Sequence, residues 1–219
     1  MKSNTDFQAV FSLLEKNRNK TFLGFAASKK NYSPFQILIS TVLSQRTKDR
    51  QTALASEMLF KKFPTTQAMA NAGLKKIRQS IKQSGFYKVK SRRLKAIARL
   101  LVEKFNGKVP STESELLSLP GVGFKTAACT LVYAFGIPSI CVDTHVHRVS
   151  NRLGWVKTKS PEKTRHALMQ LIPKNYWLKL NGLLVKHGQS VCLPRNPKCL
   201  ECRINAYCNY FKEKFSKQS

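Results

Sequence analysis

Four cysteines near the C-terminal end have the residue type and spacing of a metal centre. Cys192, Cys199, Cys202 and Cys208 follow the pattern C-x6-C-x2-C-x5-C within a polar segment. A chain of 219 residues can bury a core without disulfide staples. Thiolates are good ligands for zinc and for iron–sulfur clusters. The spacing therefore predicts a metal-binding loop, and by itself it leaves zinc and iron–sulfur open.

The charge of the chain indicates a polyanionic partner. Lys and Arg number 39 against 11 Asp and Glu, which gives a net charge of +28, and the pI is near 10.2. Nucleic acid is the first candidate, and an anionic membrane surface is the second. The most apolar stretch, 127–142, is interrupted by Gly136 and Pro138, so no membrane span is expected. We expect a monomer in the reducing cytoplasm, associated with the nucleoid.

A glycine-rich turn between two expected helices has the features of a phosphate-binding hairpin. The segment Leu119–Ala127 reads LPGVGFKTA, in which Pro120 stops the first helix. Gly121 and Gly123 permit backbone angles that side chains forbid, and they let another backbone come close. The free N–H groups and the dipole of the second helix can bind a nucleic-acid phosphate. A tight helix–helix turn without any ligand is the alternative.

Lys125 and Asp143 are the candidate catalytic pair. Lys125 falls in the first turn of the second helix, where the dipole and nearby cations favour the free amine that a nucleophile needs. Its alternative role is one more charge that neutralises phosphate. Asp143 precedes a helical pattern and could be only an N-cap, but a carboxylate in a positive cleft could also stabilise a cationic transition state. His145 and His147 lie two residues apart, so they do not share a helix face and are a poor metal pair.

Helical periodicity positions these residues. Apolar side chains recur at helical spacing in two stretches, 7–14 and 94–105. Helix starts are expected at Ser33-Pro34, at Thr112 and at Ser160-Pro161. The sequence therefore predicts an all-α fold of about ten helices, and the last ten residues are expected to be a frayed tail. Cys129 and Cys141 lie outside the metal pattern and are expected to be small buried hydrophobic residues.

The hairpin, the lysine, the aspartate and the cysteine loop together resemble the endonuclease III family of helix-hairpin-helix DNA glycosylases. The resemblance extends from Ser33 to Cys208 and includes His187-Gly188 just before the first cysteine. It implies a [4Fe-4S] cluster on the four cysteines and catalytic roles for Lys125 and Asp143. It also implies a base-excision N-glycosylase with AP lyase activity, acting by β-elimination on oxidised pyrimidines. The partner would be double-stranded DNA that contains damaged bases or abasic sites.

The resemblance also implies how DNA is held. Gln45, in the segment LSQRT, would fill the gap left by an extruded base, and Phe86, in SGFYK, would wedge between bases. The alternatives are a solvated helix-end residue for Gln45 and a core aromatic for Phe86. Many bacterial members have Leu in place of Phe86 and Asp in place of Lys48, differences that bear on pocket shape and lesion preference. The remaining expected DNA contacts are Gly121, Gly123, Arg148, Arg195 and Lys198.

The family fold implies two lobes. Residues 29–137 would form a six-helix barrel that contains the helix-hairpin-helix motif, and residues 1–28 with 138–219 would form the helical iron–sulfur cluster lobe. Lys125 and Asp143 would come from opposite lobes and meet at a groove. Two other functions stay open: a G·T or G·U mismatch glycosylase of the same superfamily, which typically lacks the hairpin lysine, and a non-catalytic iron–sulfur DNA-binding module.

Overall fold

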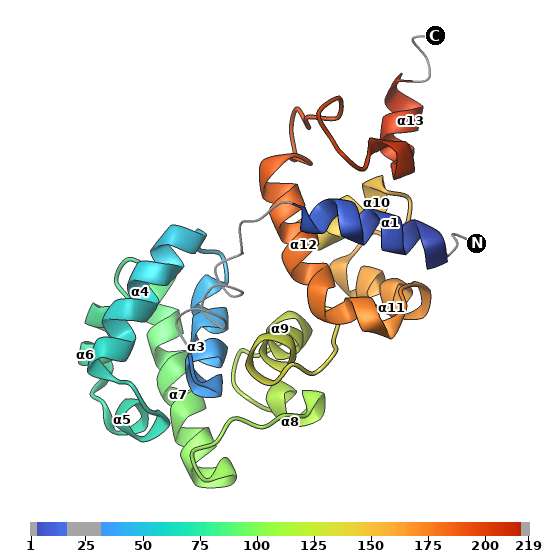
Figure 1. Ribbon diagram of the computed structural model, residues 1–219. Helices are drawn as coiled ribbons and strands as arrows, with labels where there is room; N and C mark the ends of the chain where they lie inside the picture. Colours follow the sequence, from blue (N-terminus) through green and yellow to red (C-terminus); the bar gives the residue numbers. More distant parts are fainter. Residues whose placement is uncertain (1–3, 17–31, 216–219) are drawn as a thin grey trace. The chain divides into compact units, whose positions relative to one another are not determined.

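The computed structural model describes residues 4–16 and 32–215, and every regular element in these ranges is helical. The chain divides into two compact units, Phe22–Ile137 and Met1–Thr21 with Pro138–Ser219. The expected boundary between residues 28 and 29 lies outside the described residues. In the described ranges no helix is both long and apolar enough to cross a membrane. The prediction of an all-α fold is confirmed (Figure 1).

The unit 22–137 is built around one helix that is buried along almost its whole length. Helix α3 buries every residue from Ile37 to Leu43, and it packs against α4, α7 and α9 (Figure 1). The expected barrel of six helices corresponds here to seven described helices. They are α3 (Pro34–Ser44), α4 (Asp49–Lys62), α5 (Thr66–Asn71), α6 (Leu74–Ser80), α7 (Tyr87–Phe105), α8 (Glu113–Leu117) and α9 (Phe124–Phe135).

The other unit joins the first helix of the chain to the C-terminal third. Helix α1 (Asn4–Glu15) packs against α12, far away in sequence (Figure 1). The Phe11 ring stacks on Tyr176 with centroids 4.6 Å apart and on Trp155 at 6.1 Å. The further helical segments are α10 (Thr144–Arg152), α11 (Pro161–Leu171), η1 (Lys174–Tyr176), α12 (Trp177–Ser190), η2 (Asn205–Tyr207) and α13 (Asn209–Phe215).

The three expected helix starts are confirmed, and each has a local cause. Ser33 accepts a hydrogen bond from the Gln36 backbone N–H at 3.3 Å, and the Gln36 side chain accepts one from the Ser33 N–H at 3.0 Å. Thr112 and Ser160 cap α8 and α11 in the same way through their hydroxyl groups. These side chains accept hydrogen bonds from N–H groups that have no partner within the helix. A few adjacent residues therefore determine each helix start.

The expectation of a frayed C-terminal tail is wrong for the described part of it. Residues Asn209–Phe215 form α13. The Arg152 guanidinium lies 4.8 Å from the centre of the Tyr210 ring, and the rings of Phe211 and Phe215 lie 4.9 Å apart. The short helix is held by aromatic contacts that its polar composition did not reveal.

We expect Phe11→Ala to weaken the docking of α1. Phe11 is 2% exposed, and removing a buried phenylalanine side chain costs about 3–5 kcal/mol. Both tryptophans of the chain, Trp155 and Trp177, lie in this unit, so urea unfolding followed by tryptophan fluorescence reports on it directly. The control is Gln8→Ala on the exposed face of α1. Equal midpoints for the two variants would contradict the assigned packing.

Candidate active site and metal centre

The hairpin before α9 leaves the start of that helix without a capping side chain. Five other helices begin with a Ser, Thr or Asp side chain that accepts a backbone N–H hydrogen bond, whereas the N-cap of α9 is Gly123. Leu119 and Val122 are buried in the core and anchor the turn. The positive end of α9 is thus fixed in place and suited to an external anion.

The two hairpin glycines have different roles. Gly121 has φ +73°, in the left-handed region, and a Cβ atom there would lie 2.7 Å from the Arg93 side chain. Gly123 has φ −101° and ψ 179°, which any residue can adopt, and a Cβ atom there would meet nothing within 4 Å. The expectation of unusual backbone angles is therefore confirmed for Gly121 and wrong for Gly123. At Gly123 the missing side chain leaves the helix end open.

Lys125 is the second residue of α9 and is partly buried beside this open helix end. Gln45 joins the same place from α3: its Nε2 donates to the Gly121 carbonyl at 3.2 Å and to Thr126 Oγ1 at 3.1 Å. The interpretation of Gln45 as a solvated helix-end residue is therefore wrong. The structure brings Gln45, the hairpin and Lys125 together, although 76 residues separate Gln45 from Gly121.

Phe86 is not part of the core. Its side chain is 60% exposed, and its backbone has φ +58°, which is rare for a bulky residue. The Arg46 guanidinium lies 5.7 Å from the centre of the Phe86 ring, and Arg46 itself has φ +51°. An apolar ring held outside on a strained turn is suited to contact a partner.

Asp143 begins α10 as an N-cap. Its Oδ1 accepts hydrogen bonds from the N–H groups of His145 and Val146, both at 2.9 Å. The cap therefore uses one carboxylate oxygen and fixes the side chain at the helix start. Asp143 belongs to the unit 138–219 and Lys125 to the unit 22–137, so their meeting at a groove stays a prediction.

The histidines after Asp143 have packing partners. His147 Nδ1 lies 2.6 Å from Thr164 Oγ1, and His145 Nδ1 lies 3.2 Å from the Arg148 Nη2 atom. The two rings thus contact different elements, in agreement with the expectation that they do not form a metal pair. Cys129 and Cys141 are buried, 1% and 0% exposed, which confirms the expected burial; each is disulfide-bonded, so their interpretation as merely small hydrophobic residues is wrong.

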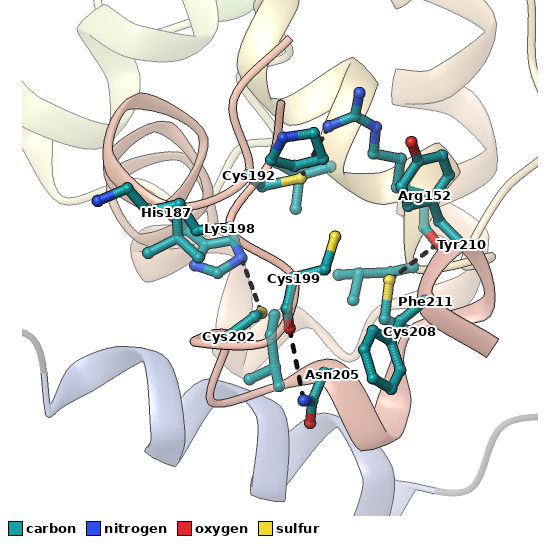
Figure 2. Close-up of a pocket in the computed structure, with 15 residues that line it drawn as sticks. Arg152, His187, Cys192, Lys198, Cys199, Cys202, Asn205, Cys208, Tyr210 and Phe211 are labelled. Atoms are coloured by element: carbon teal, nitrogen blue, oxygen red, sulfur yellow. Dashed lines mark hydrogen bonds between the residues drawn. The ribbon is translucent and has the colours of Figure 1, made fainter. Parts of the chain in front are cut away.

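The four cysteines of the C-terminal loop line one pocket (Figure 2). His187 is buried against them, with its Nε2 3.7 Å from Cys202 Sγ, and burial lowers the pKa of His187 to about 4. Burial likewise raises the pKa of the Cys202 thiol to about 11. In the described residues no three His, Cys, Asp or Glu side chains converge on the position of a single ion. Four thiols that line one pocket are a suitable ligand set for an iron–sulfur cluster or for a zinc ion.

Two arginines of α10 hold the cysteine loop. Arg152 Nη1 donates to the Leu193 carbonyl at 2.6 Å. It also lies 3.4 Å from Cys192 Sγ (Figure 2). Arg148 donates through Nη2 to the carbonyls of Gly188 at 2.8 Å and Cys192 at 3.0 Å. We expected Arg148 to face DNA, but its guanidinium is partly buried and engaged within the protein. Its contact with DNA stays a prediction.

Arg195 and Lys198 are exposed on the same loop. Lys198 lies 3.9 Å from Glu201, an exposed pair that contributes little to stability. Both side chains can therefore turn toward a ligand. Arg93, Arg152 and Lys90 are functional candidates that the sequence analysis missed. Lys90 left a signal, because it falls on the same helical stripe as Leu94, Ile97 and Leu101.

The comparisons with known proteins agree with this geometry. Residues 39–174 match the model of the HhH-GPD superfamily of base excision DNA repair proteins. The chain is 47% identical to endonuclease III of Thermotoga maritima over 87% of this chain and 89% of the relative. It is 37% identical to endonuclease III of Synechocystis over 86% and 87%.

Among solved structures, a trapped endonuclease III–DNA covalent intermediate superposes with a TM-score of 0.84 and 31% identity, over 98% of this chain and 100% of that one. A thermostable thymine-DNA glycosylase gives 0.81 and 25%, over 94% of each chain. The chain therefore belongs to the endonuclease III family of the HhH-GPD superfamily, and it is a base-excision DNA glycosylase and AP lyase.

Proposed function

We propose that this enzyme removes oxidised pyrimidines from duplex DNA through a covalent intermediate on Lys125. The observation that carries the proposal is the position of Lys125, one residue into a helix whose positive end is open and whose hairpin is contacted by Gln45. A backbone phosphate bound at the open helix end would hold the adjacent nucleotide within reach of the amine.

Binding to the DNA phosphates comes first and does not depend on the base sequence of the DNA. The N–H groups at the start of α9 bind one phosphate, with Gly121 and Gly123 allowing its close approach. Arg195 and Lys198 reach further phosphates, and Arg93, packed against Gly121, is placed to do the same. Such contacts position the protein on the duplex without reading bases.

Extrusion of the damaged nucleotide follows, because C1′ of the sugar cannot be reached inside the stack. Gln45 fills the space that the base vacates, and Phe86 wedges beside it. The stacking that they supply offsets the few kcal/mol lost when a base leaves the helix. The exposed ring of Phe86 on a rigid turn supports this role.

The chemistry is then nucleophilic. The neutral Lys125 amine attacks C1′, the bond from C1′ to the base breaks, and the base leaves with a proton. Ring opening gives a Schiff base, loss of a C2′ proton breaks the C3′–O bond, and water releases the enzyme. The Asp143 carboxylate stabilises the cationic sugar or helps to deprotonate Lys125.

The cysteine loop is proposed to bind a [4Fe-4S] cluster through Cys192, Cys199, Cys202 and Cys208. The cluster would supply no step of the reaction. It would hold the segment that presents Arg195 and Lys198, together with the carbonyl contacts of Arg148 and Arg152. The four thiols that line one pocket support this proposal.

Lys125→Gln is expected to abolish covalent trapping. Borohydride should link the wild-type enzyme to a duplex with thymine glycol or an abasic site, whereas the variant lacks the amine and should lose about 10³-fold or more of the nicking rate. The control is Lys104→Gln, an exposed lysine in the last turn of α7. Trapping by Lys125→Gln, or base release from a G·T duplex without any trapping by the wild type, would contradict the mechanism and favour a mismatch glycosylase.

Cys202→Ser should remove the metal centre. The purified wild type is expected to be brown, with visible absorption that dithionite bleaches and with four irons per chain by elemental analysis. The variant should be colourless and should melt at a lower temperature, because its loop loses the cluster that closes it. One zinc per colourless wild-type chain would overturn the assignment.

Replacing Arg195 and Lys198 together by Gln should lower the salt dependence of DNA binding. Each phosphate contact contributes about 0.9 to the slope of log K against log salt, so the slope should fall by about 2 in magnitude if each residue makes one contact. The matched control is Lys104→Gln with Lys108→Gln, which removes the same charge elsewhere. Equal slopes for the two double variants, measured by fluorescence anisotropy, would exclude the loop from the interface.

A further inference from the structure

Lys90 is a buried lysine that the proposed chemistry does not use. It lies on α7, its residue is 3% exposed, and its Nζ donates three short hydrogen bonds. The acceptors are the Leu43 carbonyl at 2.6 Å, Thr47 Oγ1 at 2.7 Å and Ser84 Oγ at 2.9 Å. Three donors on one ammonium thus meet three acceptors, so the group is fully satisfied inside the protein.

These acceptors lie in the last turn of α3 and in two loops that are distant in sequence. Leu43 and Thr47 flank Gln45 at the end of α3, and Ser84 is two residues before Phe86. The loops also touch directly: Thr47 Oγ1 lies 3.3 Å from Ser84 Oγ, and a Cβ atom on Gly85 would lie 3.0 Å from the Arg46 carbonyl oxygen. The Lys90 ammonium sits at the junction between the loop of Gln45 and the loop of Phe86.

Both loops hold a strained residue at their tips. Arg46 has φ +51° and Phe86 has φ +58°, a region that non-glycine residues occupy only when the surroundings fix them. Hydrogen bonds from a single buried donor on both sides of the junction provide such a constraint.

Packing alone does not explain a lysine here. Burial, with a smaller effect from the charge of Arg93, lowers the pKa of Lys90 to about 8, so burying the charged form is unfavourable. A methionine or leucine would continue the apolar stripe of α7 without that cost. The benefit of the ammonium is therefore in its acceptors, which lie in the last turn of α3 and in the two loops.

We propose that Lys90 is a positioning residue that joins the loops of Gln45 and Phe86, so that both side chains enter the DNA stack as one rigid unit. The inference rests on the DNA-inserting roles proposed above for these two residues. Lys90 itself touches no DNA. It acts on the extrusion of the nucleotide and not on the chemistry at C1′.

The test compares Lys90→Met with Lys95→Met. Lys95 lies on the same helix and donates to the Ala72 carbonyl at 2.7 Å, so its variant loses one charge and one buried hydrogen bond without touching either loop. Extrusion is read from the fluorescence of 2-aminopurine next to a tetrahydrofuran abasic analogue in duplex DNA, which the lyase reaction cannot cleave, so the signal needs no bond cleavage. It therefore separates this proposal from the chemistry assigned to Lys125.

Lys90→Met should lose most of the 2-aminopurine signal and about 10- to 100-fold of the single-turnover rate of base release from duplex DNA. Nicking of a single-stranded abasic oligonucleotide, which leaves no gap to fill, should stay within about twofold of wild type. Lys95→Met should behave as wild type in all three assays. Equal signals for the two variants would overturn the proposal.

A double-variant comparison shows whether Lys90 acts through the two side chains. In a Gln45→Ala, Phe86→Ala background, adding Lys90→Met should cause no further loss, because residues in one unit are not additive. A full additional loss would place the action of Lys90 elsewhere. Ser84→Ala removes one acceptor from the Phe86 loop and should weaken the signal in the same direction. The Ser84→Ala variant therefore provides an independent test if Lys90→Met folds poorly.

Discussion

The excess of positive charge restricts the partners that this protein can bind. The chain has 39 Lys and Arg against 11 Asp and Glu, so one-to-one pairing would still leave 28 cations. Such an excess needs an external polyanion, and DNA supplies phosphates along its whole length. The dipole of α9 adds to this positive field at the N-terminal end of the helix. Helix α9 begins at a glycine, without the capping oxygen that begins five of the other helices, so its positive end is suited to the phosphate that we propose it binds.

In the unit 22–137, buried groups hold strained surface turns in place. Helix α3 is buried in the core, and its end contributes Gln45, which reaches the hairpin. The Lys90 ammonium donates hydrogen bonds both to this end of α3 and to the loop of Phe86. The groups that we propose to enter the DNA duplex thus lie on short turns, while helices and buried hydrogen bonds fix the position of each turn.

The unit of 1–21 and 138–219 uses charged residues in a different way. Arg148 and Arg152 lie on α10 and donate to carbonyls of the cysteine loop, so these two cations stabilise the fold. Asp143 caps the same helix through one oxygen. An N-cap and a catalytic carboxylate are therefore compatible, because the cap fixes the orientation that catalysis would need.

The sequence by itself determined the features that neighbouring residues control. Helix starts at Ser33, Thr112 and Ser160, the all-α class and the four-cysteine loop could all be predicted, since caps and ligand spacing act over a few residues. Only the tertiary structure decided that Lys90 is buried, that Phe86 is exposed and that Arg148 turns inward. Each of these depends on contacts with elements far away in sequence, and a local pattern of charge or hydrophobicity cannot encode which distant carbonyl a side chain will meet.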